Sequence, residues 1–127
     1  MSRSLSLIIS NNLRSLEYLK VFIELQKIPN SVYYINDNKN FRIKKKIKKI
    51  LFSNKIFKNN KIFFFKKFND HIVKHLLKVN EKNFVLSLPH GIIIKSKKLL
   101  LTKNLIHFHP GKLPLFRGAT SIYYSLL

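Results

Sequence analysis

Two apolar patterns alternate along this chain, and their alternation limits the possible fold more than any other feature. Short apolar runs are followed by longer segments in which apolar residues recur every three or four positions. The first pattern is typical of buried strands, and the second is typical of helices with one apolar face. Strands that alternate with helices predict a parallel sheet covered by helices on both faces. We therefore expect an α/β, Rossmann-like fold with about five strands.

The expected elements can be placed along the sequence. Strands are predicted over residues 5–9, 32–35, 62–65, 84–88 and 105–108. Helices are predicted over residues 13–27, 41–53 and 70–80, with a short helical piece near 96–101. Pro29 ends the first helix, and Asn69 or Asp70 can cap the third. No repeat or linker divides the chain, which indicates one domain over residues 1–127.

The chain is very basic, with 25 Lys and Arg against 5 Asp and Glu and a formal charge of +20. Such a charge attracts polyanions, and nucleic acid is a possible partner. Lysine is abundant together with Asn, Ile and Phe, which a compositional drift towards A/T-rich codons would also produce. Such a drift does not explain the shortage of Asp and Glu. The lysines of residues 41–53 fall mostly on the outer face of a helix, where a solvated surface is the simpler interpretation.

Several classes of protein are disfavoured by composition. The absence of cysteine excludes disulfides, thiolate metal sites and a cysteine nucleophile. His71 and His75, or the pair His107 and His109, could bind a metal, but no acidic residue follows Glu81 and we expect no metal site. The first apolar run is too short for a signal peptide or a membrane span, so we expect a cytoplasmic protein with no membrane partner.

The four prolines and three glycines point to where a site would lie. Apart from Pro29, they gather in two clusters, at residues 89–91 and 110–118. Each cluster follows a predicted strand. In a sheet of this kind the ligand binds beyond the carboxyl ends of the strands, so both clusters are expected to face one crevice.

The second cluster carries a specific motif. Residues 106–118 read Ile-His-Phe-His-Pro-Gly-Lys-Leu-Pro-Leu-Phe-Arg-Gly. This segment resembles the signature of the formyl-tetrahydrofolate-dependent formyltransferase family, in which an Asn-x-His-Pro strand end runs into a Leu-Pro-x-x-Arg-Gly loop. The positions that agree in type are His109, Pro110, Leu113, Pro114, Phe116, Arg117 and Gly118. The family contains methionyl-tRNA formyltransferases and sugar N-formyltransferases.

A second, weaker match lies upstream. Residues 87–91, Ser-Leu-Pro-His-Gly, occupy the place of a Ser-Gly-x-Gly-Gly turn that lies beside the folate in the family. Leu88 and His90 stand where the family has glycine. The residues that the two matches imply for binding formyl-tetrahydrofolate are Ser87, Leu88, Gly91, Leu113, Pro114, Arg117 and Gly118.

The resemblance implies transfer of a formyl group to an amine, through a tetrahedral intermediate with a charged oxygen. His109 corresponds to the family's catalytic histidine, and His107 takes the place of the Asn that donates a hydrogen bond to the formyl oxygen. Residues two apart on a strand share a face, so both imidazoles can reach one reacting carbon. The acceptor is either an amino sugar nucleotide or methionyl-tRNA.

The resemblance also implies parts that these residues do not contain. The family's catalytic Asp lies beyond Leu127, and so do the strands that complete its sheet. We therefore expect a partial N-terminal, folate-binding domain whose sheet is incomplete at the C-terminal end and whose own catalysis is uncertain. The alternative is a non-catalytic basic protein of the same fold that binds nucleic acid or another polyanion.

Overall fold

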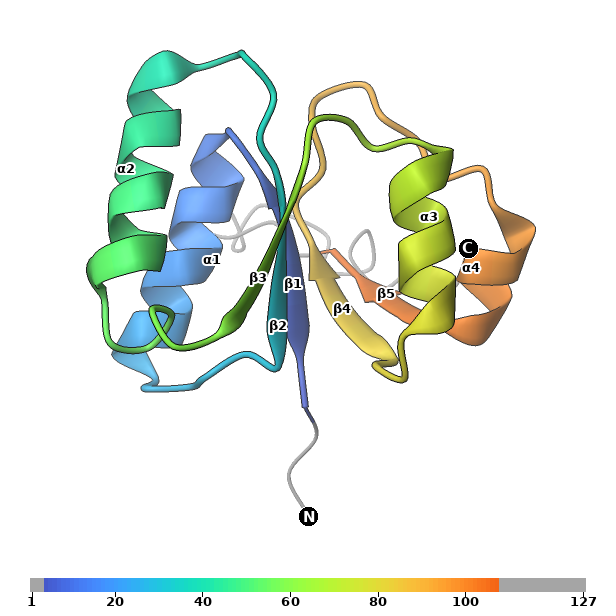
Figure 1. Ribbon diagram of the computed structural model, residues 1–127, viewed down its shortest axis with the longest axis horizontal. Helices are drawn as coiled ribbons and strands as arrows, with labels where there is room; N and C mark the ends of the chain where they lie inside the picture. Colours follow the sequence, from blue (N-terminus) through green and yellow to red (C-terminus); the bar gives the residue numbers. More distant parts are fainter. Residues whose placement is uncertain (1–3, 108–127) are drawn as a thin grey trace, which may run out of the picture.

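The computed structural model describes residues 4–107, and in this range strands and helices alternate as expected (Figure 1). The elements, in chain order, are β1 (Ser6–Ser10), α1 (Leu13–Glu24), β2 (Ser31–Ile35), α2 (Phe41–Ser53), β3 (Lys61–Phe65), α3 (Asp70–Lys78), β4 (Asn83–Leu86), α4 (Lys97–Thr102) and β5 (Asn104–Ile106). Each strand predicted from the sequence overlaps one of the five observed strands, and each predicted helix overlaps one of the four observed helices.

The strands form one parallel sheet in the order β3-β2-β1-β4-β5, which confirms the Rossmann-like α/β fold. The chain moves outwards from β1 through β2 to β3 and then returns to place β4 on the other side of β1. In the central strand, Ile8 is aligned with Tyr33 of β2 and with Leu86 of β4. The order reverses between β1 and β4, and this is the position at which ligands bind in open sheets of this type.

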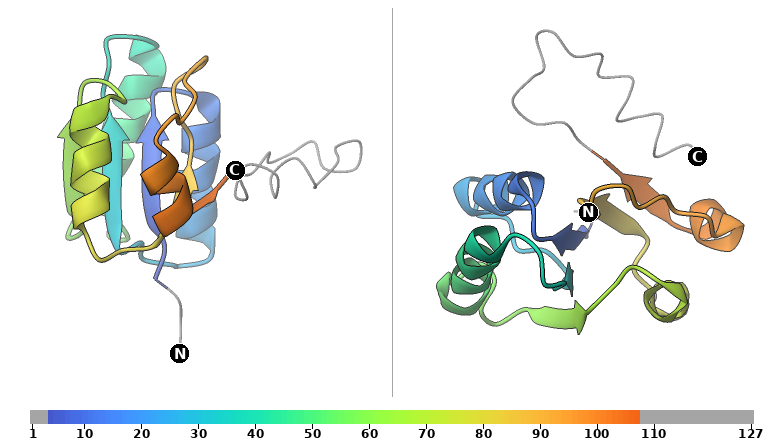
Figure 2. Two further views of the ribbon diagram at one scale, coloured as in Figure 1. Left: turned by 90° about the vertical axis from the view of Figure 1, so that its right-hand side faces the viewer. Right: turned by 90° about the horizontal axis from the view of Figure 1, so that it is seen from above.

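Helices cover both faces of the sheet. Figure 2 shows α1 and α2 on one face and α3 and α4 on the other. Successive strand residues point to opposite faces, so Leu7 and Ile9 of β1 pack with the first pair of helices while Ile8 packs with the second. Because both faces are covered, β1 and β2 are buried along their whole length, as their almost uninterrupted apolar sequences predict.

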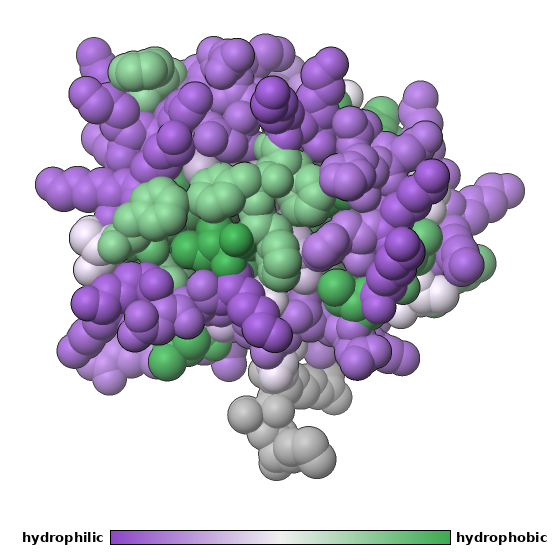
Figure 3. Space-filling view, in the orientation of Figure 1, coloured by the Kyte–Doolittle hydropathy of each residue, from purple (hydrophilic) through white to green (hydrophobic). Residues whose placement is uncertain are grey.

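The two edges of the sheet differ from its centre. β3 is the outer strand on one side, and all five of its residues keep some exposure. Figure 3, which looks onto this edge, shows apolar side chains in a band from α2 across β3 towards α3, with hydrophilic side chains above and below it. Phe64 of β3 is 47% exposed.

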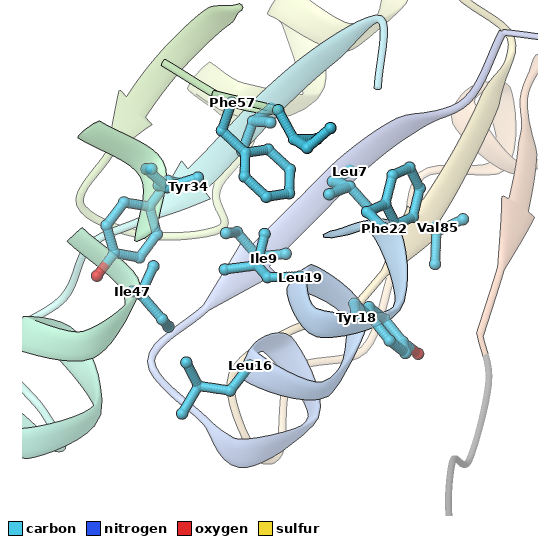
Figure 4. Close-up of a cluster of buried hydrophobic side chains, with 13 residues drawn as sticks. Leu7, Ile9, Leu16, Tyr18, Leu19, Phe22, Tyr34, Ile47, Phe57 and Val85 are labelled. Atoms are coloured by element: carbon cyan, nitrogen blue, oxygen red, sulfur yellow. The ribbon is translucent and has the colours of Figure 1, made fainter. Parts of the chain in front are cut away.

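The cluster beneath α1 and α2 is the larger of the two cores (Figure 4). Leu19 of α1, Ile47 of α2 and Phe57, from the turn after α2, meet Leu7 and Ile9 of β1, and all five are fully buried. Removing an apolar side chain of this size from water stabilises a fold by about 1.5–3 kcal/mol. This core contains Ile9 and Val85, close to the carboxyl ends of β1 and β4, and so supports the strand ends on which the candidate site is built.

The first helix ends three residues earlier than predicted. It was expected to reach Lys27, but α1 stops at Glu24 because Gln26 adopts a left-handed conformation with φ of 51°. The Gln26 N–H donates to the Ile23 carbonyl, and the Lys27 N–H donates to the Phe22 carbonyl. This is the Schellman arrangement, which usually has glycine at the left-handed position, and no glycine marks it in the sequence.

Within residues 4–107, no helix is both long and apolar enough to span a membrane.

Candidate functional site

A pocket of about 300 Å³ opens at the carboxyl edge of the sheet, beyond β4 and β5. Most of its wall comes from the loop after β4, and the remainder comes from the end of β4, from α4, from β5 with the residue after it, and from the start of α1. The lining residues are Arg14, Leu86, Leu88, Pro89, His90, Gly91, Ile92, Ile93, Ile94, Leu100, Leu105 and His107. The wall is largely apolar, with Arg14, His90 and His107 as its polar side chains, which is the usual character of a small-molecule site.

Three residues that the sequence assigned to the site lie together in this pocket: Leu88, Gly91 and His107. The predicted strand over residues 105–108 is observed as β5, which ends at Ile106, and His107 follows directly and is half-buried. The remaining predicted residues, His109, Leu113, Pro114, Arg117 and Gly118, lie outside residues 4–107. The pairing of the two imidazoles therefore stays a prediction.

Ser87 is the predicted residue that stands behind the pocket wall. It is fully buried, and its backbone N–H donates to the Ile8 carbonyl at 2.7 Å, which extends the β1 and β4 pairing by one residue. Its carbonyl accepts from the Ser10 hydroxyl at 2.6 Å, and its own hydroxyl donates to Asn12 Oδ1 at 2.8 Å. These contacts fix where the loop of residues 88–94 leaves the sheet.

Gly91 lies at the turn of this loop, with φ of 82°. This left-handed conformation is unfavourable for other residues, and the Ile92 N–H closes the turn on the Pro89 carbonyl at 3.2 Å. The turn directs the run of isoleucines at residues 92–94 along the pocket. Ile93 is 75% exposed, so the loop presents a large apolar side chain at the mouth of the site.

Asn12 was missed as a site residue, although its position just before α1 is a helix-capping signal. Its Oδ1 accepts from the Ser15 N–H and from the Ser87 hydroxyl, both at 2.8 Å. Its Nδ2 donates to the Ser10 hydroxyl at 2.9 Å and to the Leu88 carbonyl at 3.1 Å. One amide therefore uses its full hydrogen-bonding capacity to join β1, α1 and the pocket loop.

A second, more polar hollow of about 540 Å³ lies beside the first and shares Arg14, Leu88, Pro89 and His90 with it. Its other side is formed by the end of β1, by the segment that joins β2 to α2, and by the first turns of α1 and α2. There the Asn40 side chain donates to the Asn11 carbonyl at 2.7 Å, and the Asn11 side chain donates to the Asp37 carbonyl at 3.1 Å. Arg14 and Lys39 bring two positive charges to the lining of this hollow, and Asp37 brings one negative charge.

Tyr34 closes the base of this asparagine network by donating its hydroxyl to Asn11 Oδ1. Burial, reinforced by the negative charge of Asp37, raises the pKa of Tyr34 to about 12. A phenol that keeps its proton longer in the folded than in the unfolded state stabilises the fold below its unfolded pKa, near 10. That stabilisation is lost as the pH rises towards 12.

We expect Tyr34→Phe to destabilise the protein by about 1 kcal/mol at neutral pH, since one buried hydrogen bond is lost. The difference in unfolding free energy between the two proteins should narrow between about pH 10 and pH 12. Urea unfolding of both proteins across this pH range measures the difference in unfolding free energy. Deprotonation of the lysines affects both proteins alike, so its effect cancels in that difference. A difference that stays constant with pH would contradict the assignment.

The helical histidines are accounted for by packing and exposure. The His75 ring lies 4.9 Å from Phe63 and 5.6 Å from Phe65, centroid to centroid, and His71 is exposed at the start of α3. Within residues 4–107, no three His, Cys, Asp or Glu side chains are grouped closely enough to hold a metal ion.

Comparison of the chain with protein-family models, with curated proteins and with solved structures found no match.

Proposed function

We propose that this protein binds formyl-tetrahydrofolate at the carboxyl edge of its sheet and takes part in transfer of the formyl group to an amine. The observation that carries the proposal is the pocket in which Leu88, Gly91 and His107 meet. The two segments that match the family, residues 87–91 and the strand end at residue 107, adjoin this one pocket although they are apart in the sequence. The fold supports the same position, because the pocket lies next to the reversal of strand order.

We assign this pocket to the pterin end of the folate, and its largely apolar lining supports the assignment. Leu88, Ile92 and Leu105 give it apolar walls, and the backbone of residues 88–91 supplies peptide groups in an open loop. Gly91 has nothing within 4 Å of the position where a Cβ would lie, so the space above the turn is open. Formyl-tetrahydrofolate would supply the one-carbon group, and the protein would bind and orient it.

His107 is the described residue that we assign to the reacting end. A neutral imidazole donates one N–H, and in the appropriate tautomer it would stabilise negative charge on the oxygen of the transferred formyl group. Its place directly after β5 means that its backbone is anchored by the pairing of Val85 with Ile106. We retain His109 as the second catalytic histidine on the basis of the motif.

The polar hollow beside the pocket is our candidate for the acceptor. Arg14 and Lys39 suit the phosphate groups that both an amino sugar nucleotide and methionyl-tRNA carry. Arg14 lines both hollows, so it stands where the donor and the acceptor would meet.

Binding of formyl-tetrahydrofolate, measured by calorimetry, tests the proposal. We expect His107→Ala and Ile92→Glu each to weaken binding about tenfold or more, the first through a lost hydrogen bond and the second through a charge placed in the apolar wall. Ile92 is 40% exposed, so the fold should tolerate the glutamate. The matched controls are His71→Ala and Leu101→Glu, on exposed positions of α3 and α4, and these should bind as the parent does.

Failure of the parent protein to bind the folate in a saturable way would overturn the proposal. Binding that Ile92→Glu and Leu101→Glu weaken equally would overturn it as well, because the effect would then come from charge alone and not from the pocket.

A further inference from the structure

A second candidate site lies at the opposite edge of the sheet from β5, where α2 meets β3. A groove of about 510 Å³ runs between these elements. It is lined by Asn36, Asn38, Lys44, Lys48, Phe52, Phe64, Phe65 and Lys66. A second groove, of about 490 Å³, lies on the other side of Phe64, Phe65 and Lys66 and adds Lys67, Asn69 and His71. The apolar band in Figure 3 crosses this edge.

Exposed aromatic rings are the first unusual feature of this groove. Phe52 is 57% exposed and Phe64 is 47% exposed, and their rings stack with centroids 6.0 Å apart and planes 18° apart. Tyr34 lies beneath Phe64, with centroids 5.9 Å apart, and supports it from the core side. The two phenylalanines therefore form a stacked aromatic platform that is exposed to solvent.

Positive charge is the second feature. Lys44 and Lys48 are one helical turn apart on α2, and Lys66 follows the end of β3, so three lysines line the same groove as the platform. The groove contains no acidic residue among its lining residues. Asn36 and Asn38 add amide groups that can donate and accept hydrogen bonds.

We propose that this edge, defined by Phe52, Phe64, Lys44, Lys48 and Lys66, binds single-stranded nucleic acid. Bases stack on the phenylalanine rings, and the lysines neutralise the phosphates on either side of them. Aromatic platforms within a positively charged groove are how proteins hold unpaired strands without strong sequence preference. The inference is independent of formyl transfer, since none of these five residues lines the folate pocket.

Charge decides between this occupant and the alternatives. A second copy of the chain would bring the same lysines to the same edge, and each copy carries +20. A double helix keeps its bases stacked inside, so it could meet the lysines but not the rings. An acidic peptide could meet the charge, yet it would not require planar aromatic side chains in the groove.

Fluorescence anisotropy with a labelled oligouridylate of about 12 nucleotides tests the proposal. The double variant Phe52→Leu, Phe64→Leu keeps an apolar surface but removes the rings, and we expect it to bind about tenfold more weakly at every salt concentration. The triple variant Lys44→Gln, Lys48→Gln, Lys66→Gln should reduce the slope of log K against log salt by about 2, since each phosphate contact on a single strand contributes about 0.7.

Matched controls remove equal charge and equal apolar surface elsewhere. Lys74→Gln, Lys78→Gln, Lys98→Gln, on α3 and α4, should leave the salt slope unchanged. Leu25→Ala, Leu101→Ala, which are 68% and 85% exposed in the parent, should leave the affinity unchanged. Thermal unfolding followed by circular dichroism identifies any variant that binds weakly because it is unfolded. If the double variant Phe52→Leu, Phe64→Leu is unfolded, the single variant Phe64→Leu is tested in its place.

Three results would overturn the proposal. The first is unchanged affinity when the two rings are replaced in a folded protein. The second is that an RNA duplex or polyglutamate binds as tightly as the oligouridylate and that replacing the two rings does not weaken its binding. The interaction would then depend on charge alone. The third is a dimer in sedimentation that the ring replacements dissociate, which would assign the edge to a second copy.

Discussion

Glu81→Ala is expected to lower the free energy of unfolding by about 3 kcal/mol, a large part of the 5–15 kcal/mol that holds a domain folded. Glu81 lies between α3 and β4, at the amino edge of the sheet. Its Oε1 accepts from the hydroxyls of Tyr33 at 2.6 Å and Ser6 at 3.3 Å. Its Oε2 accepts from Asn30 Nδ2 at 2.7 Å and from the Ser31 hydroxyl at 2.8 Å.

The cost is large because three of these four donors are buried. Ser6, Ser31 and Tyr33 are at most 1% exposed, and removal of the carboxylate leaves their hydroxyls without this acceptor in the protein interior. Burial, together with the hydrogen bond to Glu81, raises the pKa of Tyr33 well above its usual range, so its hydroxyl stays a donor even in alkaline solution. One side chain thus joins β1, β2 and the segment before β4.

Urea unfolding followed by circular dichroism measures the loss. Glu17→Ala is the control, because it removes the same charge from an exposed position on α1 and should change stability by less than about 0.5 kcal/mol. The loss of unfolding free energy in Glu81→Gln should lie between those of Glu81→Ala and Glu17→Ala, since its amide nitrogen replaces an oxygen that accepts two hydrogen bonds. If Glu81→Ala and Glu17→Ala prove equally stable, the carboxylate has no special structural role.

Asn12→Ala is expected to cost about 2–3 kcal/mol and also to weaken folate binding. Loss of the cap on α1 accounts for about 1 kcal/mol, and the remainder comes from the lost contacts to Ser87 and Leu88. The Leu88 carbonyl is where the pocket loop is attached to β1 and α1. Without that attachment the loop must be ordered by the ligand, so part of the binding energy is spent on ordering it.

Two variants separate capping from loop anchoring. Asn12→Asp keeps the oxygen that accepts from Ser15 but loses the donation to Leu88, so it should restore much of the stability and little of the affinity. Asn69→Ala removes the cap of α3, whose side chain accepts from the His71 N–H at 3.1 Å, and should reduce stability without changing affinity. Folate affinity that follows stability through all three variants would show that Asn12 acts only as a cap.

Local sequence patterns were sufficient to predict the fold. The apolar run of residues 62–65 and the helical spacing of residues 41–53 both appear where expected, as β3 and α2. The end of a helix was less predictable where it depended on backbone conformation alone. The early end of α1 follows from the conformation of Gln26, a residue that gives no such signal in the sequence.

The candidate site was only partly predictable, for a different reason. Leu88, Gly91 and His107 belong to contiguous motifs, and the expectation that these motifs face one crevice agrees with their place in one pocket. The roles of Glu81 and Asn12 could not, because their partners are distant in sequence: Ser6 lies 75 residues from Glu81, and Ser87 lies 75 residues from Asn12. Such pairs become neighbours only once the strand order places β4 beside β1.

That strand order also governs how the sheet can be assembled. Residues up to 65 contain β1, β2 and β3 with both of the helices that cover one face, so this half can pair as soon as it leaves the ribosome. The other side of β1 has no partner until β4 is synthesised. Because β1 and β4 are far apart in the sequence, we expect their pairing to form late in folding. Until it forms, one edge of the central strand is open to non-native pairing, which chaperones would have to prevent.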